Sequence, residues 1–285
     1  MILRNWSVRI GGGVILLLVI ISATAPWLGT VDRSLFDAAS RDLRPGQSGE
    51  IMALDGELTR HRFLMGSDSF GRDIYSRVVY GARVSLLVGL ASALLALAFG
   101  IVLGLCAGYL RRLDGPLMRV MDGLMAIPAI LLAITLVALW RASILTVVLA
   151  IAITEIPRVT RLVRSLVLSI REEPYIEAAV SLGTPTWKIM FGHILPNCIA
   201  PLLVQGTYIC ASAILVEAIL SFLGVGLPPD IPTWGNIMAE GRVQFVAYPH
   251  NVFFPGVFLA ITVLAVNILG DGLRDTLDPK MAKRV

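Results

Sequence analysis

The chain has few charged residues for its length. Only 15% of its 285 residues are Asp, Glu, Lys or Arg, whereas 56% are hydrophobic. A soluble domain usually carries about a quarter charged residues, so this composition argues against a soluble protein and for a chain surrounded largely by lipid. The net formal charge of +4 is small and dispersed, which gives no indication of nucleic-acid binding.

Residues typical of metal and catalytic sites are scarce as well. The three cysteines show no C-x-x-C spacing and the three histidines are scattered singly, so we expect neither a disulfide framework nor a metal site. H-E-x-x-H and G-x-S-x-G motifs are also absent, and we expect no cofactor and no catalytic residue. The residues concerned are Cys106, Cys198, Cys210, His61, His193 and His250.

One glycine-rich stretch looks superficially like a phosphate-binding loop. Gly66 to Asp73 reads G-x-x-x-x-G-R-D, but Arg72 and Asp73 stand where that loop needs Lys and Ser or Thr. We therefore expect Asp68, Arg72 and Asp73 to have a structural role in turn formation and local ion pairing.

Long charge-free runs dominate the rest of the sequence. A helix needs about 20 mainly apolar residues to cross the hydrocarbon of a membrane, and open sheets cannot cross it because their edge groups would stay unpaired. The runs therefore predict an all-α integral membrane protein. We expect six transmembrane helices, five from runs of sufficient length and a sixth if the shorter run at 142–154 continues through Glu155 and Pro157. The five longer runs are 10–31, 84–110, 123–140, 189–216 and 243–270.

The predicted spans divide the chain into three parts. Residues 1–31 form an N-terminal transmembrane helix, which we expect to be retained rather than cleaved as a signal peptide. Residues 32–82 form a periplasmic loop, and residues 83–285 form a core of five further helices. Both termini are expected inside, because Lys and Arg concentrate in the inside loops of this topology; the arginine-rich first outside loop is the exception.

The segment 158–198 is the most informative part of the core. Arg158, Arg161 and Arg164 recur at helical spacing and indicate a helix that leaves the membrane. Pro174 breaks this pattern, a new short helix is predicted from Tyr175 to Leu182, and Gly183 ends it by taking a positive φ.

This short helix has the features of a docking element. Held between two bends, it would project from the membrane as a rigid knob. Ala178 and Ala179 are small enough for a partner surface to approach closely, and Glu177 offers a charge.

The same segment resembles the EAA motif of ABC importer permeases. Glu177-Ala-Ala-Val-Ser-Leu-Gly183, followed by Leu195-Pro196, has the motif's residues and spacing, although His193 stands where many permeases have Ile. The string from His193 to Asn197 resembles the dipeptide/oligopeptide/nickel family in particular. Other strings that resemble the second permease subunit of this family are 66–73, 76–86, 220–226, 232–235 and 270–279.

The resemblance implies a fold, partners and a function. The fold would be that of a type I ABC importer permease. The partners would be a second permease, two cytoplasmic ATPase subunits that hydrolyse ATP, and an extracytoplasmic solute-binding protein, all at the bacterial inner membrane. The residues that match the ATPase-coupling motif are Glu177, Ala178, Ala179, Gly183, Leu195 and Pro196. Peptides are the expected cargo, and nickel chelates, glutathione or oligosaccharides are alternatives.

Two features of the spans allow more than one interpretation. Glu217 is a carboxylate inside the fifth span, so it either lines the translocation path or forms an interhelical contact, for example with Arg242. Gly100, Gly104 and Gly108 form a small face that suits either packing within the subunit or contact with a partner permease.

Two other functions compete with the importer. A secondary transporter would be expected to show paired charges inside the membrane and interrupted helices in repeated halves, and we predict neither. A membrane anchor or sensor without transport is the second alternative. Copurification with an ATPase separates the importer from both.

Overall fold

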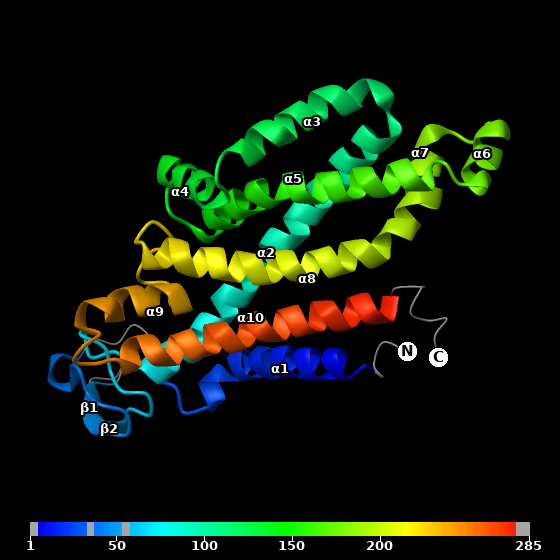
Figure 1. Cartoon of the computed structure of the whole chain (residues 1–285). Coiled ribbons are helices and arrows are strands. Elements are labelled where there is room, and N and C mark those ends of the chain that lie inside the picture. The colour runs from blue at the N-terminus through cyan, green and yellow to red at the C-terminus, as the bar shows by residue number, and fades with distance from the viewer. Residues whose placement is uncertain (1–4, 33–36, 53–57, 278–285) are drawn as a thin grey trace.

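The chain folds into a bundle of long helices with a small hairpin at one end (Figure 1). The computed structural model describes residues 5–32, 37–52 and 58–277; the end of the 270–279 string and the last eight residues lie outside this range. The long helices are α1 (Trp6–Ala23), α2 (Ile74–Tyr109), α3 (Arg111–Ala126), α4 (Ala129–Leu139), α5 (Ile144–Ile170), α8 (Leu195–Phe222) and α10 (His250–Leu277). The shorter elements are β1 (Ser48–Met52), β2 (Leu58–Arg62), α6 (Pro174–Ser181), α7 (Thr186–Lys188), a π-helical turn (Ile189–Ile194) and α9 (Trp234–Gly241), with 3₁₀ turns at Ala25–Trp27, Ala38–Ser40 and Arg242–Gln244.

The six predicted spans are supported only approximately by length and composition. Four described segments are long and apolar enough to cross a membrane: α1, α2, α10, and α8 together with the two turns before it. The pair α3 and α4 makes a fifth if it counts as one span. The sixth predicted span is α5, which has 27 residues but carries Glu155, Arg158 and Arg161 within its first 18. These three charged residues distinguish α5 from the four apolar segments.

The third predicted span is broken. The run 123–140 was expected to form one transmembrane helix, but α3 ends at Ala126 and α4 begins at Ala129, with a bend of 90° between them. Pro128 lies at the start of α4 with an extended ψ, and its ring disfavours a helical conformation at Ile127.

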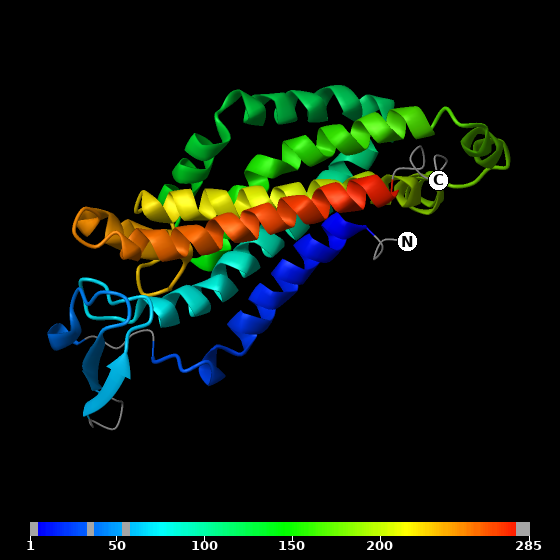
Figure 2. The same ribbon diagram turned by 60° about the horizontal axis from the view of Figure 1, so that its bottom comes forward.

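The first span is packed into the bundle. A Cβ atom placed on Gly11 of α1 would lie 2.6 Å from the carbonyl oxygen of Ala265 in α10, and one on Gly272 would lie 2.8 Å from the backbone nitrogen of Val8. The two helices therefore approach backbone to backbone (Figure 2).

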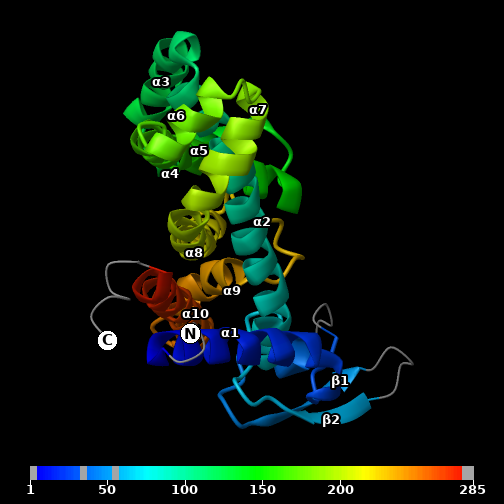
Figure 3. The same cartoon turned by 90° about the vertical axis from the view of Figure 1, so that its right-hand side faces the viewer.

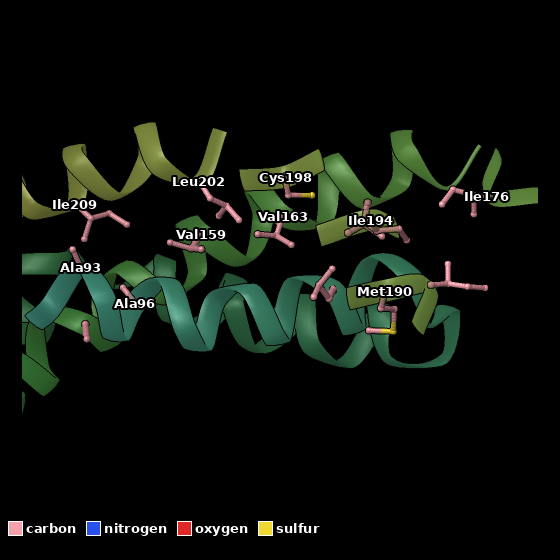
Figure 4. Packing of buried hydrophobic residues seen from close by; sticks show 14 residues of the cluster. Ala93, Ala96, Val159, Val163, Ile176, Met190, Ile194, Cys198, Leu202 and Ile209 are labelled. Carbon is pink, nitrogen blue, oxygen red and sulfur yellow. The ribbon is translucent and has the colours of Figure 1, made fainter. Parts of the chain in front are cut away.

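The core lies where α2, α5 and α8 meet (Figure 4). Val159 and Val163 of α5 are fully buried against the glycine face of α2, with Ile209 of α8 beside them. A Cβ atom on Gly104 would lie 2.5 Å from the Cβ atom of Val163, and equivalent clashes would occur at Gly100 and Gly108. The glycine face thus serves packing within this subunit, which decides between the two interpretations that the spacing left open.

The molecule has two distinct ends. At one, which we call the hairpin end, β1 and β2 pair antiparallel from Ser48–Arg62 to Met52–Leu58, and α9 lies at the same end of the bundle (Figure 1). At the other, the α6 end, α1 begins and α10 ends at the same end of the bundle as α6 and α7 (Figures 1 and 2). Figure 3 looks along the bundle from the α6 end and shows α8 between the α3–α5 group and the α1–α10 pair.

Candidate coupling site

The helix that carries the EAA residues forms at nearly the predicted place. α6 spans Pro174–Ser181, one residue earlier than expected at both ends. Pro174 occupies its first turn, where the missing amide proton costs nothing, and Glu177 also lies in that turn, where a carboxylate interacts favourably with the helix dipole.

Gly183 ends α6 as predicted. Its φ is +75°, and its amide donates to the carbonyl of Val180 at 2.9 Å while the amide of Thr184 donates to Ala179 at 3.1 Å. This pair of hydrogen bonds is the Schellman arrangement, which requires a left-handed residue. A Cβ atom at Gly183 would meet nothing within 4 Å, so only the backbone conformation restricts this position.

One side of α6 anchors it to the bundle and the other is free. Ile176 and Ala179 are buried, with Ile176 in the same cluster as Met190 and Ile194. Glu177 and Ala178 are exposed. Of the two alanines predicted to receive a partner, only Ala178 is accessible, because Ala179 supports the anchor.

Exposed apolar side chains run from α6 into α7 and the π-helical turn. Leu182 is 85% exposed and Trp187 is 61% exposed, with Tyr175, Val180 and Phe191 also exposed nearby in sequence. Large apolar side chains gathered at the tip of a projecting element are typical of a protein interaction surface. Glu177 contributes to a concavity of ≈ 580 Å³ that it shares with Arg171 at the end of α5 and Tyr109 at the end of α2.

Leu195 and Pro196 lie at the start of α8, directly after the π-helical turn. Leu195 is half-buried and Pro196 is exposed in the first turn of α8. Single π turns inside helices often mark functional positions. Here the turn joins α6 and α7 to the long α8 span.

Asn197 connects the two parts of the motif, and the sequence analysis did not identify it as a site residue. Its side-chain amide donates to the carbonyl of His193 at 2.7 Å and to the hydroxyl oxygen of Tyr175 at 3.2 Å. Burial and the carboxylate of Glu173 raise the pKa of Tyr175, so its hydroxyl stays protonated. The amide therefore ties α6 to the base of α8. The sequence feature that could have identified Asn197 is its position directly after Leu195-Pro196.

Glu217 is enclosed by hydrogen-bonding groups. Its side chain has no exposed surface, the Ser221 hydroxyl donates to Oε1 at 2.8 Å, and the Ser85 hydroxyl of α2 donates to Oε2 at 3.4 Å. The expected pairing with Arg242 was wrong, since that guanidinium donates instead to the carbonyl of Phe222 at 2.6 Å. This environment favours the interhelical interpretation.

A cluster of buried, ion-paired side chains lies at the hairpin end. Asp68 accepts from Arg72 at 2.6 Å and from Arg77 at 2.7 Å, and both arginines also pair with Glu240 of α9. Asp73 caps α2 by accepting from the amide of Ser76 at 2.8 Å. The structural role predicted for Asp68, Arg72 and Asp73 is confirmed, and Arg77 and Glu240 complete the cluster.

The helix α5 also carries a pair of opposite charges. Arg158 donates to Glu155 at 2.9 Å. In α5 the neighbouring Val159 packs against Gly100, near the centre of the charge-free run 84–110. The ion pair joins two residues of the same helix, because α5 continues without a break through Pro157, as the predicted sixth span required.

The sequence of this chain is similar to those of membrane components of transport systems. Residues 96–283 match the family described as binding-protein-dependent transport system inner membrane component. The chain is 48% identical to a probable peptide ABC transporter permease of Sinorhizobium fredii, over 99% of this chain and 91% of that protein. It is 41% identical to a di/tripeptide transport system permease of Pseudomonas aeruginosa, over 95% of this chain and 88% of that one.

A solved structure has the same fold. The inward-facing methionine ABC transporter matches with a TM-score of 0.59 and 18% identity, over 72% of this chain and 98% of the matched chain. At 18% identity the match supports the type I importer fold of the bundle. It carries no information about the cargo.

Proposed function

Because the chain belongs to the family of inner membrane components of binding-protein-dependent transport systems, we propose that it forms half of the path by which an ATP-driven importer takes up peptides. The chain is accordingly a multi-pass protein of the inner membrane and has a transporter's role rather than an enzyme's. Peptide cargo is supported by the relatives that are named for peptides. Glutathione is the next candidate, because a glutathione transport system permease of Pectobacterium atrosepticum is 45% identical over 76% of this chain.

The α6 end couples the path to ATP hydrolysis in this proposal. The supporting observation is the exposed tip of α6, where Leu182 is 85% exposed directly before the left-handed Gly183. Such a surface suits insertion into a groove of an ATPase subunit. Ala178 lets the partner approach and Glu177 supplies the charge, while Leu195 and Pro196 pass the movement of α6 into α8.

The remaining partners follow from this assignment. A second permease completes the path, two ATPase subunits bind at the cytoplasmic face, and a solute-binding protein delivers cargo at the opposite face. The α6 end is then cytoplasmic and the hairpin end extracytoplasmic.

A labelling experiment tests this topology. Cys introduced at Thr186 would be protected from an impermeant thiol reagent on intact spheroplasts, while Cys at Ser48 would react. Both positions are exposed, and the native Cys106, Cys198 and Cys210 would first be replaced; the reverse pattern would contradict the topology.

Uptake by purified complex tests the function itself. The chain, coexpressed with the permease, ATPase and binding-protein genes beside its own, should copurify with the ATPase and import a labelled peptide into liposomes only with ATP and binding protein. The Glu155–Arg158 pair in the span is the observation that would suit a secondary transporter. Uptake driven by a proton gradient without ATP would favour that alternative and reject the importer.

A further inference from the structure

The packing of α5 on α2 sets the depth of Arg158 in the membrane. Cβ atoms on Gly100 and Gly104 would lie 2.5 Å from Val159 and Val163 respectively, so the two helices run level along this stretch. Gly100 is eleven residues before Arg111, the first charge after the run 84–110, which corresponds to about 16 Å of helix. The hydrocarbon is about 30 Å thick. Arg158, next to Val159, therefore lies near its middle.

The ion pair at this depth is asymmetric. The Glu155 side chain is only 7% exposed, whereas the Arg158 side chain is 58% exposed. A guanidinium has five N–H donors, and Glu155 is the acid that Arg158 pairs with among the described residues. An Arg that faced lipid at this depth would be costly, and such residues face the bundle interior or water-filled cavities instead. The surface around Arg158 is therefore one that water or a solute reaches.

A cavity continues from this surface toward the α6 end. Leu162, one helical turn beyond Arg158 on the same face, lines a cavity of ≈ 580 Å³ together with α8 and the end of α10. Gln205, Tyr208 and Arg274 contribute polar groups to its wall. This volume is within the range of about 300–1,000 Å³ that is typical of small-molecule sites.

We propose that this face of α5 and the adjoining cavity form the inner half of the path, and that Arg158 binds the carboxylate of the passing solute. The proposal rests on the proposed function, since it assigns a substrate group to the path of that importer. The buried carboxylate of Glu155 holds the guanidinium in place from behind, and the outward donors can take a carboxylate through two parallel hydrogen bonds. The substrate class is thus a peptide with a free C-terminal carboxylate.

The test uses the reconstituted complex and two forms of one tripeptide. The tripeptide is offered with a free or an amidated C-terminus, each at a concentration that saturates the binding protein. Arg158→Gln alone leaves Glu155 buried without its partner, so the decisive variant is the double change Glu155→Gln with Arg158→Gln, which removes both charges and keeps the shape of the buried side chain at position 155. Arg161→Gln is the matched control, because Arg161 lies on the same helix, is about half exposed and pairs with Asp122 of α3.

The double variant should assemble with wild-type thermal stability and lose import of the free-carboxylate peptide about tenfold, the usual scale for a hydrogen bond to a charged group. The ratio of the import rate of the free-carboxylate peptide to that of the amidated peptide should fall. Arg158→Lys should retain part of the wild-type ratio. Wild-type import or an unchanged ratio in the double variant would overturn the proposal, as would loss of the partner permease, which would make Arg158 a subunit contact. Failure of the proposed function looks different, because the wild-type complex would then show no import driven by ATP and binding protein.

Discussion

The charge cluster at the hairpin end and the tip of α6 treat charged and apolar groups in opposite ways. At the hairpin end Arg77 is 2% exposed and Asp68 is 3% exposed, although both are charged. At the α6 end Leu182 is 85% exposed, although it is apolar. Buried charges are tolerated only when they are paired and hydrogen-bonded, so the charge cluster at the hairpin end is closed on itself. Exposed apolar groups gain from being covered, so the α6 end is built to receive something else.

This difference has a mechanical consequence. The cluster of Asp68, Arg72, Arg77 and Glu240 joins the outer loop, the start of α2 and α9 into one unit. α6 is instead attached through Ile176 and Ala179, the Asn197 bridge and its two bends. Changes at the hairpin end should therefore affect stability, and changes at the α6 end should affect coupling.

Arg77→Met should have the largest effect on stability. It leaves the carboxylates of Asp68 and Glu240 short of a partner in a buried site, which costs about 3–5 kcal/mol for a broken buried pair. Thermal unfolding of the purified complex would measure the loss. Arg60→Met is the control, because Arg60 is exposed on β2 and its loss should change little. A stable Arg77→Met complex would remove the contrast between the two ends.

Glu217→Leu should destabilise the complex by about 1–3 kcal/mol, since it leaves the hydroxyls of Ser221 and Ser85 buried without their acceptor. Glu217→Gln retains an acceptor oxygen and should keep most of the stability and transport. Thermal unfolding and liposome uptake with saturating binding protein should be measured together. If Glu217→Leu proved stable but defective in transport, the side chain would belong to the path.

Gly183→Val should abolish coupling with a smaller stability change. A β-branched residue resists the φ of +75° by about 1–2 kcal/mol, and the strain is confined to the end of α6. Gly183→Asn is the matched variant, because Asn tolerates this conformation, and it should retain transport. The readouts are ATP-driven uptake and recovery of assembled complex. Equal uptake by the Val and Asn variants would show that the turn geometry does not matter for coupling.

Glu177→Gln should have the smallest effect on stability, within about 0.5 kcal/mol, because the side chain is exposed. It should still reduce uptake, since the proposed docking uses its charge. Glu172→Gln, which changes an exposed carboxylate just before α6, should leave uptake unchanged. Similar uptake for the two variants would limit the coupling surface to its apolar residues.

The sequence predicted best those features that depend on neighbouring residues. The apolar runs located the spans, and Pro174 and Gly183 located α6 to within one residue, because a missing amide donor and a positive φ act over a single turn. The short run at 142–154 was harder to interpret. Its length sufficed for a span only if the helix continued through Glu155 and Pro157, and α5 does continue to Ile170.

By itself, the amino-acid sequence determined the class of the protein, the positions of its long apolar helices and the local shape of α6, since hydropathy and backbone preference need no long-range information. Only the tertiary structure decided which groups meet. It placed Glu240 against Arg72 and Arg77 across more than 160 residues of chain, Glu217 against Ser85, and Arg158 at the level of Gly100. Such pairs depend on how the helices pack, and spacing along the chain carries no measure of that packing.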